Sequence, residues 1–80
     1  KEGEALACLE EVLSLVGYAK TTVTGDVTAV VIEQWKTRLQ STGVTDRNNP
    51  ETARMQFWRL RKALENKKQI RTQGEEIWLA

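Results

Sequence analysis

The segment NNPETARMQFWRLRKALEN, residues 48–66, constrains the fold more than any other part of the chain. Asn49 can cap a helix, Pro50 suits the first helical position, and Glu51 interacts favourably with the positive end of the helix dipole. Apolar residues then recur at spacings of three and four, which places them on one helix face. These residues are Ala53, Phe57, Leu60 and Leu64. The sequence therefore predicts a third helix from about Pro50 to Asn66 whose inner face packs on a core.

An amphipathic helix is also predicted near the start of the chain, from Glu4 to about Ala19. Its apolar stripe consists of Leu6, Leu9, Val12, Leu13 and Val16. The outer face of this helix is acidic through Glu10 and Glu11. Cys8 lies near the edge of the apolar stripe and is interpreted as a small buried or half-buried hydrophobic residue.

A second helix is predicted to end at about Gln40. Val31, Trp35 and Leu39 are four residues apart and therefore stack along one face, with Trp35 as a core anchor. The helix starts somewhere between Thr28 and Ile32, because the valines there also suit a strand. Gly43 is expected to end it.

Two further segments have the composition of β-structure. TTVTGDVTAVVI, residues 21–32, is rich in β-branched residues and is interpreted as an extended connection with one short strand around Val27–Val31. In QIRTQGEEIWLA, residues 69–80, two short strands flank a turn at Gln73–Gly74, which is a hairpin signal.

The predicted order is helix, extended connection, helix, loop, helix and hairpin. Three helices followed by a C-terminal β-hairpin, or wing, is the plan of a winged helix-turn-helix domain. The alternative is a three-helix bundle with a tail. The wing is favoured because Ile70, Ile77 and Leu79 need burial. Residues 1–80 are expected to form a single domain, and the missing initiator Met suggests that it was cut from a longer protein.

The composition excludes several kinds of chemistry. The chain has no His and one Cys, so it lacks the ligands of a structural zinc site and the base of a His-dependent triad. No glycine-rich phosphate-binding loop is present, and the paired carboxylates (Glu10 with Glu11, Glu75 with Glu76) are adjacent and do not face one another. We therefore expect no catalytic residues, no cofactor, no metal and no small-molecule substrate. The absence of a long apolar run and the single Cys8 lead us to expect a cytoplasmic protein without a membrane partner.

The distribution of charge points to an anionic partner. Residues 1–46 carry 4 basic and 7 acidic side chains, whereas residues 47–73 carry 8 basic and 2 acidic ones. On a helical wheel, the face opposite the core stripe of the third helix carries Met55, Trp58, Arg59 and Lys62, with Arg54 and Arg61 on one flank. Such a face can offer donors to phosphates and base edges. A basic helix face can also be only a solvated surface.

Other residues extend this candidate DNA-binding surface. Lys67, Lys68 and Arg71 continue the positive charge into the wing, where phosphate contact is expected. Asn48, Asn49 and Thr52 lie at the start of the helix, where N-termini bind phosphates. Trp58 can pack beneath the hairpin against Trp78, stack on a base or contact a partner protein, and packing is favoured because large exposed aromatic residues are uncommon. Trp78 is interpreted as a strand packing residue.

The pattern EQWKTRL…DRNNPETARMQFWRLRKALENKKQI…GEEIWLA resembles the C-terminal winged-helix region of plasmid- and phage-type replicative helicase ATPases. The shared elements are a Trp in the second helix, an N-P-x-x-A start, a third helix with aromatic and basic residues, and a closing I-W-L. The resemblance covers about the last 50 residues. It implies a DNA-associated domain attached to an ATPase or primase module of a larger replication protein.

Three hypotheses follow from the sequence. The favoured one is a non-enzymatic domain that binds DNA through the third helix and the wing. The alternative is a protein-interaction module that docks a replication or transcription partner, with Met55 and Trp58 as an anchor. A third is that the domain helps a larger enzyme to oligomerise.

Overall fold

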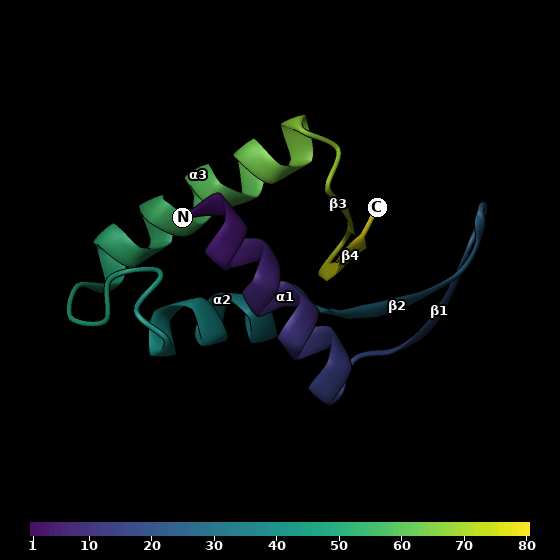
Figure 1. Cartoon of the computed structure of the whole chain (residues 1–80), viewed down its shortest axis with the longest axis horizontal. Helices are drawn as coiled ribbons and strands as arrows, with labels where there is room; N and C mark the ends of the chain where they lie inside the picture. Colours follow the sequence, from purple (N-terminus) through teal and green to yellow (C-terminus); the bar gives the residue numbers. More distant parts are fainter.

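The computed structural model describes residues 1–80 and contains three helices and four strands, which form an α+β fold. Helices and strands are interleaved along the chain (Figure 1). In chain order the elements are α1 (Glu2–Val16), β1 (Tyr18–Thr22), β2 (Gly25–Val31), α2 (Ile32–Ser41), α3 (Pro50–Asn66), β3 (Ile70–Gln73) and β4 (Glu76–Leu79). None of the helices combines the length and the apolar character needed to cross a membrane.

The strands form one antiparallel sheet in the order β1-β2-β4-β3. The prediction of a winged helix made of three helices and one C-terminal hairpin is therefore wrong. The C-terminal hairpin exists, but β2 pairs with β4 through Ala29–Trp78, Val30–Ile77 and Val31–Glu76, so it is half of a larger sheet. Its turn is also one residue later than predicted, because Gln73 pairs with Glu76 and leaves Gly74 and Glu75 as the connection.

The segment predicted as an extended connection is a second hairpin, β1–β2. Its strands pair from Tyr18–Ala29 to Thr22–Gly25, and Gly25 has a φ of 123°, which a residue with a side chain rarely adopts. The Thr22 hydroxyl donates to the Gly25 carbonyl at 2.7 Å and thereby stabilises the turn. Figure 1 shows this hairpin extending away from the helices as an arm. We call it the β1–β2 arm.

The first helix ends three residues earlier than predicted. Gly17 follows Val16 in an extended conformation, and its N–H donates to the Leu13 carbonyl at 3.0 Å. A Cβ at Gly17 would lie 2.2 Å from the Leu13 carbonyl oxygen and 2.7 Å from the Thr28 methyl group. The chain therefore needs a glycine where it leaves α1 and enters β1.

The other helix boundaries agree more closely with the predictions. α3 spans the predicted residues, and α2 begins at Ile32, the later of the two predicted limits. α2 ends at Ser41, and Gly43 beyond it has a φ of 82°. These agreements reflect strong local signals, namely a cap in α3 and a left-handed glycine after α2.

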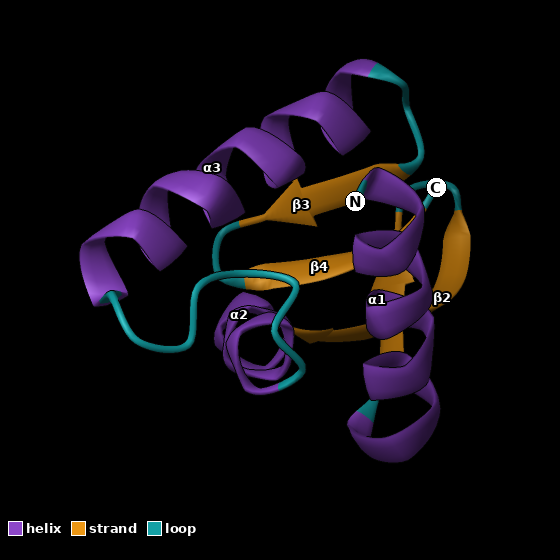
Figure 2. Cartoon of the chain, turned by 60° about the vertical axis from the view of Figure 1, so that its left-hand side comes forward, coloured by secondary structure: helices purple, strands orange, loops and turns teal.

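The three helices pack on one face of the sheet, as the turned view in Figure 2 shows. Trp35 is fully buried at their meeting point, so its prediction as a core anchor is confirmed. Its indole N–H donates to the Ala5 carbonyl at 3.0 Å, and its ring lies edge-on to Phe57 at 5.1 Å. Cys8 is also buried, as predicted, and burial raises the pKa of its thiol although Arg38 and Thr42 oppose this.

The opposite face of the sheet, which we call the outer face, has no helix over it. Ala29 and Trp78 are cross-strand partners and therefore lie on the same face, and both are buried although they do not belong to the main core. The prediction that Trp78 is a packing residue is confirmed. Glu76 joins the strands across this face: its two carboxylate oxygens accept hydrogen bonds from Tyr18 and Lys20 of β1, each at 2.6 Å.

Candidate nucleic-acid interface

The position of α3 is fixed by its cap and by its apolar stripe. The Asn49 side chain accepts hydrogen bonds from the backbone N–H groups of Glu51 at 3.1 Å and Thr52 at 3.2 Å. All the residues of the predicted inner stripe are buried; they are Ala53, Phe57, Leu60 and Leu64. The opposite face of α3 therefore points away from the protein.

The N-terminus of α3 is less suited to phosphate binding than the sequence suggested. Two of its N–H groups are taken by the Asn49 side chain, and the N–H groups of Asn48 and Asn49 donate to the Asp46 carboxylate at 2.8 and 3.1 Å. A phosphate would have to displace these bonds and approach an acidic side chain. We therefore leave Asn48, Asn49 and Thr52 outside the proposed interface.

The outward face of α3 carries five exposed basic or apolar residues, Arg54, Met55, Trp58, Arg59 and Lys62, together with the exposed polar residues Glu51 and Asn66 near its two ends. The favoured prediction that Trp58 packs beneath the C-terminal hairpin is wrong, because 58% of Trp58 is exposed. The reason is geometric: Trp78 lies on the outer face of the sheet, between its strand partners Ala29 and Arg71. The Lys62 ammonium lies 5.0 Å from the centre of the Trp58 ring, within the range of a cation–π interaction.

Ion pairing separates the basic residues into two groups. Arg61 pairs with Glu65 at 2.9 Å, and Lys67 pairs with Glu2 of α1 at 2.5 Å, so acids of the protein itself neutralise these two predicted contacts. Lys20 and Arg38 are also paired. Six of the eight remaining cations lie between residues 47 and 71: Arg47, Arg54, Arg59, Lys62, Lys68 and Arg71.

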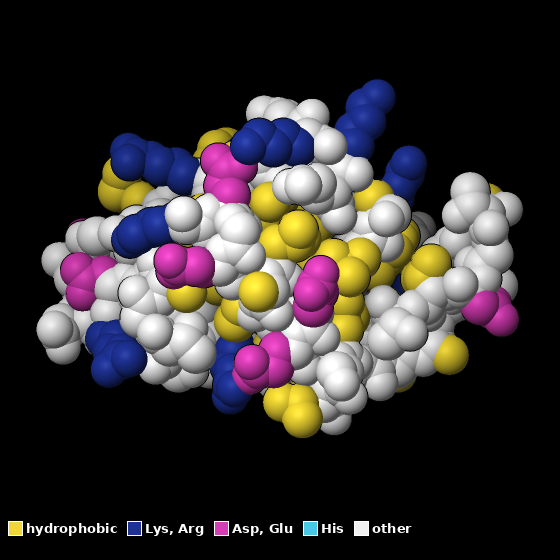
Figure 3. All heavy atoms as spheres, in the orientation of Figure 1, with side chains coloured by type: hydrophobic (Ala, Val, Ile, Leu, Met, Phe, Trp, Pro, Cys, Tyr) yellow, Lys and Arg dark blue, Asp and Glu magenta, His cyan; other side chains and the backbone are white.

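The charge of this region is therefore strongly positive. Glu51 is the only acid between residues 47 and 71 that has no ion-pair partner. On the face shown in Figure 3, most of the visible Lys and Arg side chains lie along the upper side of the molecule, over α3 and the region beyond its C-terminal end, and most of the visible acidic side chains lie below them. A surface of this kind attracts anions.

The backbone beyond α3 makes an unusual turn at Lys68. This residue has a φ of 59°, in the left-handed region where glycine or asparagine is usual. Hydrogen bonds from Lys68 N–H to the Glu65 carbonyl at 2.9 Å and from Gln69 N–H to the Leu64 carbonyl at 3.0 Å hold the turn. The chain then enters β3, which carries Arg71.

The sequence interpretation missed one contribution to this surface, the tip of the β1–β2 arm. Thr22, Val23 and Thr24 line the same hollow as Lys68 and Arg71, although more than forty residues separate them in the chain. The sequence does contain a feature that could have predicted this hairpin. Gly25 follows Thr24 between two segments rich in β-branched residues, a pattern that is typical of a hairpin.

Comparison with protein-family models, with curated protein sequences and with solved structures finds no match to this chain. The resemblance of the last 50 residues to replicative helicase ATPases therefore stays a prediction.

Proposed function

We propose that this domain binds double-stranded DNA through the outward face of α3. The observation that carries the proposal is that Arg54, Arg59 and Lys62, none of which has an acidic partner, lie on one exposed helix face. Arginine can donate two hydrogen bonds to a guanine or to a phosphate, and lysine contacts phosphates as a point charge. A helix that is anchored by a buried apolar stripe can present these groups in a fixed arrangement.

Salt dependence provides the first test. If the domain neutralises about four phosphates, the logarithm of its affinity should fall with the logarithm of salt concentration with a slope of about −3.6. Between about 50 and 200 mM salt, the affinity should then decrease on the order of 100-fold. Fluorescence anisotropy with a labelled duplex measures this slope. A slope near zero, or no binding at the lowest salt, would contradict the proposal.

Removal of charge from α3 provides the second test. The double variant Arg59→Gln/Lys62→Gln should weaken binding and reduce the magnitude of the slope by about 0.9 for each phosphate that the protein no longer neutralises. Lys36→Gln is the control, because Lys36 also has no ion-pair partner but lies beside Ala53, on the side of α3 that carries the core stripe. It should leave the slope unchanged.

A second candidate function, docking of a partner protein, is supported by the exposure of Met55 and Trp58, at 57% and 58%. Aromatic residues of this kind often carry much of the energy of an interface. Under this alternative, Trp58→Ala would abolish binding of the partner, while the charge variants of α3 would matter little. If the charge variants of α3 lose affinity for the duplex and Trp58→Ala loses less, the result favours DNA binding over docking of a partner protein.

A further inference from the structure

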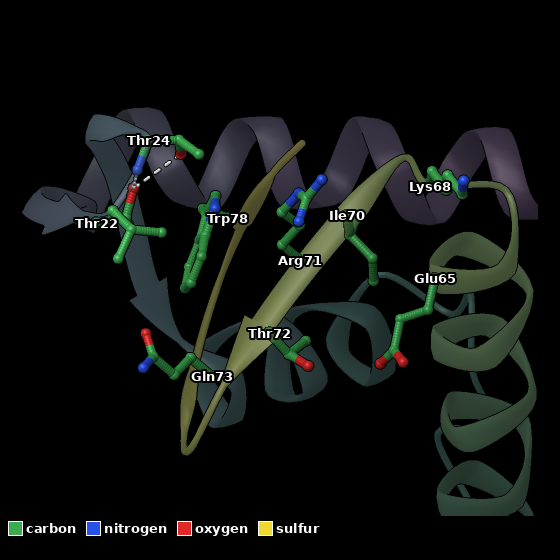
Figure 4. Close-up of a pocket in the computed structure, with 10 residues that line it drawn as sticks. Thr22, Thr24, Glu65, Lys68, Ile70, Arg71, Thr72, Gln73 and Trp78 are labelled. Carbon is green, nitrogen blue, oxygen red and sulfur yellow. Dashed lines mark hydrogen bonds between the residues drawn. The ribbon is translucent and has the colours of Figure 1, made fainter.

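A hollow of about 670 Å³ lies between the tip of the β1–β2 arm and strand β3. The arm contributes Thr22, Val23 and Thr24 to one side, and β3 with the end of α3 contributes the other side (Figure 4). Trp78 lines the hollow between these two sides. The hollow is open to solvent and adjoins the C-terminal end of α3, so it continues the positively charged surface described above.

Two cations on the wall of the hollow have no acidic partner. In Figure 4, Arg71 lies between Trp78 and Lys68, and neither Arg71 nor Lys68 takes part in an ion pair. Glu65 also lines the hollow, but Arg61 neutralises its carboxylate. The net charge of the lining side chains is therefore positive, which favours a phosphate-bearing ligand.

The remaining lining groups suit a nucleotide. Trp78 forms part of the floor of the hollow, although it is only 7% exposed and the Lys20 ammonium lies 5.9 Å from its ring centre, and Thr22, Thr24 and Gln73 contribute hydroxyl and amide groups. Grooves that bind single-stranded nucleic acid combine cations along the phosphate backbone with aromatic side chains near the bases. Polar groups at such a site can hydrogen-bond the edges of an unpaired base.

The size of the hollow suits one unpaired nucleotide better than a duplex. Its volume is within the range of small-ligand sites, about 300–1,000 Å³. A duplex cannot enter it, since the major groove alone is about 12 Å wide. An unpaired nucleotide can enter, because its base is free to turn away from the helical stack.

We propose that this hollow binds an unpaired nucleotide of the same DNA whose duplex part lies on α3, so that the domain prefers junctions between double- and single-stranded DNA. Arg71 and Lys68 hold the phosphate, and Trp78 and the arm enclose the base. This inference rests on the proposed duplex binding by α3. It gives the β1–β2 arm a function, because the arm supplies one wall of the site.

The experiment compares a blunt duplex with the same duplex carrying a single-stranded overhang of about six nucleotides at the 3′ or the 5′ end. We expect one of the two overhangs to increase the affinity on the order of tenfold, as the stacking of one or two bases would. Equal affinity for the blunt duplex and both overhang duplexes would overturn the proposal.

Substitutions on the two walls locate the overhang. Arg71→Gln should remove most of the overhang's advantage and change the affinity for the blunt duplex by less than about twofold. Arg59→Gln is the matched control on α3 and should weaken both DNAs by the same factor. If Arg71→Gln instead weakens both DNAs equally, Arg71 contacts only the duplex backbone and the proposal is wrong.

Val23 allows a test from the opposite wall. This side chain is fully exposed at the tip of the arm, so its substitution should not disturb the fold. Val23→Asp places a negative charge beside the overhang and should reduce the gain in affinity that the overhang gives over the blunt duplex. Val23→Asn adds no charge and should preserve most of this gain. Identical behaviour of the two variants would exclude the arm from the site.

The outcomes separate this inference from the proposed function. Binding of the blunt duplex without an overhang effect contradicts only the inference. Binding of the overhang DNA that responds to Arg71→Gln but not to Arg59→Gln supports the hollow and contradicts duplex binding by α3. The absence of binding to every DNA contradicts both.

Discussion

The two faces of the sheet are stabilised in different ways. The helix-facing side buries aliphatic residues of three strands, Val30, Ile70 and Ile77, against α1, α2 and α3. On the outer face Trp78 is the only large buried side chain, and Glu76 links β4 to β1 through polar contacts with Tyr18 and Lys20. One face therefore resembles the core of a globular protein, while the other depends on a few specific contacts. This difference leaves the outer face free to form an open binding site.

The largest loss of stability is expected on the helix-facing side. Trp35→Ala removes a fully buried indole, its hydrogen bond to Ala5 and its edge-on contact with Phe57. The free energy of unfolding should fall by about 3–5 kcal/mol, which is a large part of the stability expected for a small domain. Chemical denaturation followed by circular dichroism measures this loss. Trp35→Phe is the control and should retain a folded domain.

A smaller loss is expected on the outer face. Trp78→Ala should decrease the free energy of unfolding by about 2 kcal/mol, because Trp78 is 7% exposed but packs outside the main core, with the Lys20 ammonium 5.9 Å from its ring centre. The same denaturation measurement applies, with Trp78→Phe as the control. If Trp78→Ala destabilises the domain as much as Trp35→Ala, the outer face is a second core and the contrast between the faces is wrong.

At Lys68, stability and binding are expected to change in opposite directions. Its φ of 59° costs a residue with a side chain about 1–2 kcal/mol, and glycine avoids this cost but loses more entropy on folding. Lys68→Gly should therefore stabilise the domain by about 0.5–1 kcal/mol. The same variant should weaken binding of overhang DNA, because the cation is lost. Lys68→Gln keeps the side chain and removes the charge, so it should weaken binding without stabilising the domain.

The sequence was sufficient to predict the elements that have strong local signals. The Asn49 cap and the apolar periodicity of α3 determine both its ends and its buried face, and the strands of the C-terminal hairpin flank a glycine turn. The exposure of Met55 and Lys62 followed from the same periodicity. These features depend on residues that are close together in the chain, so a single sequence contains the information.

The pairing of strands that are far apart in the chain could not be predicted from the sequence. β2 pairs with β4 across more than forty residues, and this pairing turns two hairpins into one sheet. The position of Trp58 depended on where the C-terminal hairpin lies, so it was predicted wrongly for the same reason. The ion pair between Lys67 and Glu2 joins opposite ends of the chain and also could not be predicted from local patterns.

The smallest effect is expected from the polar link on the outer face. The hydrogen bonds from Lys20 and Tyr18 lower the pKa of Glu76 below its ordinary value of about 4.3, and the contact with Glu76 raises the pKa of Tyr18. A carboxyl group whose pKa is lower in the folded state stabilises the fold above its unfolded pKa, and this contribution disappears as the pH falls through the folded value. Glu76→Gln should therefore reduce the melting temperature slightly at pH 7 and have no effect at a pH well below 4.

The pH dependence of this variant tests whether the outer face depends on the Glu76 contacts. Melting curves of the native chain and of Glu76→Gln should converge as the pH is lowered, because protonated Glu76 no longer forms an ion pair with Lys20. Tyr18→Phe is the matched control: it removes one hydrogen bond but keeps the carboxylate and its ion pair, so its difference from the native chain should vary less with pH. If the Glu76→Gln curves stay parallel to those of the native chain down to low pH, the carboxylate does not stabilise this face. Strand β1 would then be held by its backbone pairing with β2 and by the contact of Lys20 with Trp78 alone.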